Sequence, residues 1–530
     1  MTLAAACGWS LVRSLAVALA AGPVCKRQCA WMRGMDGRLR QPMWLMLFLP
    51  FLCPELWTGY GWSGFGLRLA NTEFWNLLPS GWFPVSPRWI INRDAAVDEF
   101  LLDLLLFFRA VPVGTLALYF APPPPLSAAA VFCRDLTIAQ RSNTASATQA
   151  LPPARWRPGW LGFALRGRWH AAFPAVGLMF LVSFQEFELA SLIGRPAWTV
   201  WLFDAQVGGL ALSESMRLAL LPVACQLIVL VPLLWSLATT RTSPSAEGAL
   251  AQSLSRPIQT ALGSLVFAGV ALTCVVPALL VGRDTLGGLT RVFQNTSQFQ
   301  TLLSEIAIGT GYALGAAVAS ALIAARLLNS ARASRLALAA TVVGALPGLF
   351  GSLVLSLALI QLLLFPMFRV LYKTPPALAA GLVLFLLPRA MLLRLIMWVS
   401  RQRSAAHLAV LLCESPAAKN RHAARELTWQ MRWRSEFWSV TLLTYWSFLD
   451  LTIAYLLAPV TIVSAPVMLY NQMHFGKNAV LAALVFLTVL IPALVFVVAS
   501  AARPLAVCAF EWLSYRTGLL TGNARTANRG

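Results

Sequence analysis

The chain has 530 residues, of which 58% are hydrophobic and 12% are charged, and its mean hydropathy is +0.69. This composition excludes an ordinary soluble domain, in which about a quarter of the residues are charged, and it indicates an all-α polytopic membrane protein. The formal net charge of +21 does not indicate a nucleic-acid partner, because the basic residues fall in short segments between apolar runs and not along one polar face.

Eleven apolar stretches are close to the length of about 20 residues that a helix needs to cross a bilayer. In chain order they cover residues 3–22, 43–62, 99–121, 171–193, 216–238, 258–281, 303–327, 336–364, 376–398, 437–462 and 478–502. The first stretch has no basic start and carries Arg13 inside its apolar part. We therefore expect it to be a spanning helix and not a cleaved signal peptide.

The distribution of lysine and arginine predicts the orientation. With the N-terminus outside, 27 of the 41 basic residues fall in inside segments and eight in outside segments, and the other six lie within helices or at their ends. Because basic residues accumulate in cytoplasmic loops, we expect an N-terminus outside and a cytoplasmic C-terminus, in the inner (plasma) membrane.

The order of sequence features in the first half recurs in the second. A small-residue-rich helix leads through a basic segment to an apolar stretch with central prolines, Pro50 and Pro54 in one half and Pro347 in the other, and EFELASLIGRP is echoed later by FLDLTIAYLLAP. These features predict two parallel repeats of five and six helices. The predicted domains are a first repeat over residues 1–240 with a long cytoplasmic loop over 122–169, a cytoplasmic linker over 241–257, a second repeat over 258–502 with a coupling loop over 399–436, and a cytoplasmic tail over 503–530.

This arrangement resembles the permease of a type I ABC importer in its fused two-domain form. The Pro-Gly helix and EFELASL followed by WTVWLFDAQVGG are most similar to the ferric iron permease family. The resemblance implies alternating access driven by a separate cytoplasmic ABC ATPase, present in two copies, and solute delivery by an extracytoplasmic substrate-binding protein. The chain has no GxxxxGK[ST] loop for ATP phosphates, so we expect a transport subunit that is not an enzyme and binds no cofactor itself.

The family's ATPase contact is a short loop helix with the pattern EAAxxxG. Its best match here is HAARELT, with His422, Ala423 and Ala424 at the EAA positions and Thr428 at the glycine position, although the glutamate and the glycine are absent. A short basic amphipathic helix can dock into a groove of a soluble partner. The alternative is a loop that lies on anionic lipid headgroups.

Three carboxylates lie inside predicted spans, where an ionised group is costly. They are Glu186, Glu188 and Asp450, and the repeat places Glu186 and Asp450 at similar depth. One interpretation is that Glu186 or Glu188, together with Asp450, lines the path of a cationic solute, because hard cations prefer oxygen ligands. Since Glu186 and Glu188 would lie about 200° apart on a continuous helix, they should not face the same cavity.

Alternative interpretations remain open at this stage. The carboxylates could instead form structural pairs, with Asp103, Arg109, Arg389 and Arg394 as the charged groups available on neighbouring helices. The solute could be thiamine, a polyamine or a similar compound in place of ferric iron. A polytopic enzyme acting on lipid-linked substrates would need clustered acidic residues or histidines, and no HxxxxD or DxD motif occurs. No resident metal site is expected, because the nine cysteines and four histidines are scattered.

Overall fold

A computed structural model describes residues 2–65, 87–120, 172–239, 254–331, 335–400, 408, 411–412, 423–424, 426–427, 434–459, 461–473 and 478–516. Within these residues every regular element is helical, as the sequence predicts. The expected cytoplasmic loop over 122–169 and most of the linker over 241–257 lie outside the described residues.

The helices follow one another with short connections. Their bounds are α1 Leu3–Gly34, α2 Gly37–Leu52, α3 Glu55–Trp62, α5 Pro87–Phe120, α8 Ala172–Phe184, α9 Glu188–Ile193, α10 Trp198–Val207, α11 Leu212–Thr239, α12 Arg256–Val270, the π-helix η3 Ala271–Val275, α13 Val276–Gln294, α14 Thr296–Ala331, α15 Arg335–Leu349, α16 Ser352–Leu363, the 3₁₀-helix η4 Arg369–Leu371, α17 Pro375–Ser400, α20 Arg434–Leu449, α21 Leu451–Leu457, α22 Ala465–Met473 and α23 Ala479–Arg516.

Seven of the described helices are long and apolar enough to cross a membrane, and the number rises to nine if each of two bent pairs is one span. These helices indicate a multi-pass membrane protein, but the expected count of eleven is not confirmed. Two expected spans are interrupted. The stretch over 43–62 is divided between α2 and α3, and the stretch over 171–193 forms α8, of 13 residues, followed by α9, of six.

Several helices extend beyond the expected spans. Helix α1 continues through the expected inside loop to Gly34, and α5 already begins at Pro87. Helix α23 continues to Arg516 and so includes the first part of the expected tail. The basic and polar residues at these ends do not stop a helix, because each added turn satisfies its own backbone hydrogen bonds.

Four apolar segments are broken in their middle, and each break has a local cause. Pro54 separates α2 from α3, because proline disfavours the helical conformation in the residue before it. Gly351, with a φ of 91° in the left-handed region, begins α16 after a bend of 106°. The bend between α20 and α21 is 59° and occurs at Asp450. The break between α8 and α9 lies at residues 185–187.

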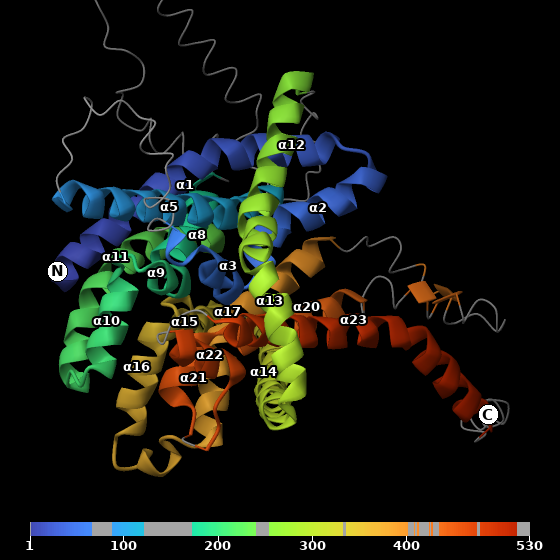
Figure 1. Ribbon diagram of the computed structural model, residues 1–530. Helices are drawn as coiled ribbons and strands as arrows, with labels where there is room; N and C mark the ends of the chain where they lie inside the picture. The colour runs from blue at the N-terminus through green and yellow to red at the C-terminus, as the bar shows by residue number, and fades with distance from the viewer. Residues whose placement is uncertain are drawn as a thin grey trace, which may run out of the picture.

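The same helix neighbours occur in both halves of the chain. Helix α1 packs against α5 and α8, and α14 packs correspondingly against α17 and α20. Helix α2 contacts α5 as α15 contacts α17, and α3 contacts α9 as α16 contacts α21. The long run α12–η3–α13 packs against α2, α3 and α23 (Figure 1). It joins the two halves, because α2 and α3 come from the first half.

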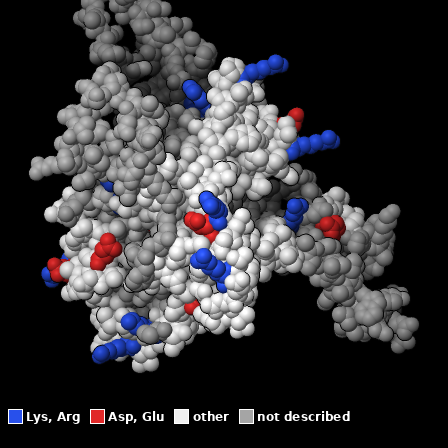
Figure 2. Space-filling view, viewed as in Figure 1, with Lys and Arg blue, Asp and Glu red and all other residues white. Residues whose placement is uncertain are grey.

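The outer surface of the described part is predominantly apolar. Figure 2 shows isolated charged side chains on a largely uncharged face. Large apolar side chains such as Ile228 and Leu279 are each 74% exposed. Contiguous exposed apolar surface of this kind marks contact with lipid or with another protein, which agrees with helices that lie in a bilayer.

Candidate functional site at the helix breaks

The three carboxylates singled out from the sequence all lie at helix breaks. Glu186 lies between α8 and α9, Glu188 is the first residue of α9, and Asp450 lies between α20 and α21. Glu186 is buried, and the other two are half-buried. A broken helix inside a membrane leaves backbone N–H and C=O groups without partners, and water is not there to satisfy them.

Glu186 and Asp450 have matching roles as helix caps. The Glu186 Oε1 atom accepts a hydrogen bond of 3.0 Å from the backbone nitrogen of Leu189. The Asp450 Oδ1 atom accepts one of 2.8 Å from the nitrogen of Ile453. In both halves, therefore, a carboxylate bonds the N–H group three residues further along and stabilises the start of a half-helix.

Glu188 connects the two halves. Its Oε1 atom accepts a hydrogen bond of 3.1 Å from the backbone nitrogen of Leu451, the first residue of α21. The expectation that Glu186 and Glu188 point to opposite sides assumed a continuous helix, and the break at 185–187 removes that assumption. Both side chains lie near Glu55, so they belong to the same group of charges.

The C-terminal ends of the broken helices are also bonded by side chains. Gln185 Nε2 donates to the carbonyl oxygen of Leu349 at the end of α15 and to Oε1 of Gln226 at 3.0 Å. Trp198 Nε1 donates to the carbonyl of Phe184 at 2.7 Å. The breaks are therefore built-in features whose backbone groups have specific partners.

Two arginines face these carboxylates. Arg109 of α5 is buried, forms an ion pair with Glu55 at the start of α3, and donates a hydrogen bond of 3.4 Å to the carbonyl of Cys53. Arg389 occupies the corresponding place on α17, donates to the carbonyl of Phe385 at 2.8 Å and stacks on the Phe385 ring. Ser352 takes the position of Glu55 at the start of α16, so Arg389 has no ion pair of this kind among the described residues.

Together these residues form what we call the central polar cluster: Glu55, Glu186, Glu188, Asp450, Arg109 and Arg389. They are electrostatic neighbours at the junction of the two halves. Four carboxylates face two guanidinium groups, so the cluster favours positive charge. Sequence analysis missed Glu55, although a glutamate inside the apolar stretch over 43–62 is the signal that identified the other three.

The remaining charged residues considered from the sequence lie elsewhere. Asp103 is 3.4 Å from Arg13, and Arg13 also pairs with Glu99, which in turn pairs with Arg195 at 3.0 Å. Arg394 lies 4.0 Å from Glu436. The structural pairing expected for Asp103 is thus with α1, while Arg109 pairs with Glu55.

The predicted coupling residues are only partly described. His422 and Thr428 lie outside the described residues, whereas Ala423 and Ala424 are helical and Ala424 is fully buried. Their contact with an ATPase stays a prediction. Within the described residues no group of three or more histidine, cysteine or acidic side chains is placed to hold a metal ion.

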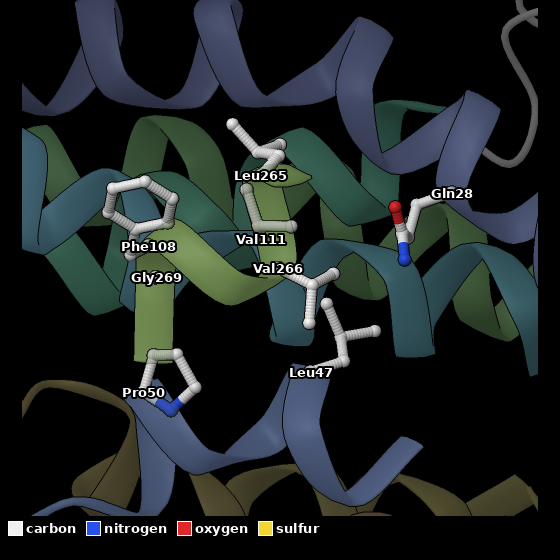
Figure 3. A pocket seen from close by; sticks show the side chains of 8 residues that line it. All are labelled: Gln28, Leu47, Pro50, Phe108, Val111, Leu265, Val266 and Gly269. Atoms are coloured by element: carbon white, nitrogen blue, oxygen red, sulfur yellow. The ribbon is translucent and has the colours of Figure 1, made fainter. Parts of the chain in front are cut away.

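A small hollow lies apart from the cluster, where α12 crosses α1, α2 and α5. It is lined by apolar side chains that include Leu47, Phe108 and Val266, and Gln28 lies at its edge (Figure 3). Gln28 is fully buried, and neither polar atom of its amide has a described partner. A bound water would satisfy it, but the hollow has no charged group for a solute.

No protein-family model, no curated protein and no solved structure matches the chain.

Proposed function

We propose that the chain is the membrane-spanning permease subunit of an ABC importer and that the central polar cluster lines its translocation path. The observation that carries this proposal is the meeting of broken helices from both halves at a set of charged side chains. Transporters commonly place solute sites at such repeat interfaces, where discontinuous helices end. The matching helix neighbours in the two halves support the same interpretation.

The excess of carboxylates over guanidinium groups favours a positively charged solute. Ferric iron is the solute we propose, because the resemblance is to ferric iron permeases and a hard cation prefers oxygen ligands. Thiamine and polyamines are cationic alternatives within the same class. In this proposal the chain supplies the path, and a separate ATPase in two copies supplies the energy.

Alternating access would act through contacts that join the halves. Glu188 to Leu451 and Gln185 to Leu349 cross the junction, as does the 2.7 Å hydrogen bond between the hydroxyls of Ser191 and Tyr470. All three originate in the segment from the end of α8 to α9. Rocking of one half against the other would break or exchange these bonds and change access to the cluster.

Purification in mild detergent from the native cells tests the proposal. We expect a P-loop ATPase to co-purify and to be lost when residues 404–430 are replaced by a glycine-serine linker of equal length. The matched control replaces residues 242–253 of the other cytoplasmic linker and should retain the ATPase. Absence of an ATPase, under conditions that preserve a known importer complex, would contradict the ABC assignment and leave a membrane enzyme or an uncoupled protein as the alternatives.

A further inference from the structure

A groove on the outside of the second half contains an ion pair that the proposed function does not use. It lies between α14, α17 and α20, has a volume of about 120 Å³, and is lined by Arg394, Glu436 and Ser439 together with apolar side chains. Its charged groups come from the last turns of α17 and the first turn of α20. With the predicted orientation this is the cytoplasmic half of the membrane.

The two charges hold each other only loosely. Arg394 Nη1 lies 4.0 Å from Glu436 Oε1, which is longer than the 2.7–3.2 Å of a hydrogen bond. The side chains are 27% and 20% exposed, so both can be reached from the groove. Arg394 donates no hydrogen bond to a described residue, so its guanidinium N–H groups are free to bind an anion.

The walls of the groove are apolar and face outward. Val318 and Leu322 of α14 are 41% and 63% exposed, and Val440 and Leu443 of α20 lie on the opposite wall. An acyl chain beside α14 would cover the exposed valine and leucine. A ligand that combines a charged head with an apolar chain therefore fits the groove better than a soluble ion does.

We propose that the α14–α17–α20 groove binds a phospholipid with a phosphoethanolamine headgroup. The phosphate would bind the Arg394 guanidinium, the primary ammonium would donate to the Glu436 carboxylate, and an acyl chain would lie along Val318 and Leu322. Charge complementarity selects this headgroup: Glu436 offsets Arg394, so the groove has no net charge to attract an anionic lipid. A choline headgroup has no N–H to donate to Glu436.

Binding of this lipid does not depend on the transported solute, so the proposal stands or falls separately from the assignment as an importer. Native mass spectrometry of the purified full chain tests it, with phosphatidylethanolamine, phosphatidylcholine and phosphatidylglycerol of identical acyl chains added at equal concentration. We expect phosphatidylethanolamine to be retained about tenfold more than either of the others, the ratio that one charge-assisted hydrogen bond gives.

Two substitutions separate the roles of the charges. Glu436→Gln should remove the preference for phosphatidylethanolamine over phosphatidylcholine, because the ammonium loses its anionic partner. Arg394→Gln should weaken retention of both lipids, since both carry the phosphate. The matched control is Glu305→Gln, which removes a carboxylate about 20 Å further along α14, at 1.5 Å per residue, and should change nothing.

A third variant tests the groove by size. Ala321→Phe adds a ring to the lining without changing charge, and it should reduce retention of every lipid in the series. Elution of each variant at the wild-type volume in size-exclusion chromatography shows that it is folded. Equal retention of the three lipids by the wild-type protein, or a loss of preference in Glu305→Gln as large as in Glu436→Gln, would overturn the proposal.

Discussion

The carboxylate of Glu188 accepts a hydrogen bond from the backbone nitrogen of Leu451, a residue 263 positions further along the chain. This bond links the start of α9 in the first half to the start of α21 in the second. It also answers why an apolar segment contains a glutamate, because the broken helix α21 needs an acceptor that the membrane does not provide. The same side chain is part of the central polar cluster, so one residue serves both the fold and the proposed path.

Substitutions of Glu188 and Asp450 separate those two roles. Glu188→Gln and Asp450→Asn keep an oxygen that can accept the backbone hydrogen bond and remove the negative charge. We expect both variants to be folded and to show reduced ferric iron uptake, measured with labelled iron in cells that contain the partner subunits. Unchanged uptake in both variants would contradict a role of these charges in the path.

Glu188→Ala removes the acceptor as well as the charge. The Leu451 N–H group then has no partner, and we expect the unfolding free energy to fall by about 1–3 kcal/mol, the cost of an unsatisfied buried polar group. Thermal stability in detergent measures the difference from Glu188→Gln. Equal stability of the two variants would show that the hydrogen bond to Leu451 does not support the fold.

The Glu55–Arg109 pair is best tested by a double-mutant cycle. Arg109→Met alone should destabilise by about 3–5 kcal/mol, because it leaves Glu55 without its partner at the centre of the protein. The double variant Glu55→Gln/Arg109→Met should be more stable than Arg109→Met, since the unpaired charge is gone. The readout is the melting temperature of the detergent-solubilised protein, and additive effects of the two substitutions would contradict the pairing.

Close helix packing predicts a large effect at Gly288 of α13. A Cβ atom there would lie 1.8 Å from the carbonyl oxygen of Ala479 at the start of α23, so Gly288→Ala must push the two helices apart. We expect a loss of about 1–3 kcal/mol, as for other overpacked sites. Gly282→Ala on the same helix is the matched control, because no heavy atom lies within 4 Å of its Cβ. It should be neutral or slightly stabilising, since alanine favours a helix.

Arg13 tests whether α1 is an integral part of the membrane domain. It is buried, donates to Glu99 and to the carbonyl of Pro196 at 3.2 Å, and we expect Arg13→Met to destabilise by about 1–3 kcal/mol. Arg27→Met is the control, because Arg27 is exposed on the same helix. N-terminal sequencing of the purified protein should recover α1. Loss of α1 from the purified chain would indicate a cleaved segment.

The sequence predicted the fold class and most of the spanning segments, and it identified three of the four carboxylates in the cluster. Glu55 was missed because it was treated as part of an apolar stretch, although the same rule for intramembrane charges applies to it. The two spans that are interrupted, over 43–62 and 171–193, show the limit of a composition window. A window of about 20 residues detects average hydropathy, and a proline or a capping carboxylate in its centre hardly changes that average.

What the sequence by itself determined is the property that depends on local composition: long apolar helices of a multi-pass membrane protein, separated by basic segments. Only the tertiary structure decided where those helices break and what each charge contacts. The bonds from Gln185 to Leu349 and from Glu188 to Leu451 join residues far apart in the chain. The physical reason is that a backbone group freed by a break must find its partner within about 3 Å, and in an apolar interior that partner comes from whichever helix packs beside it.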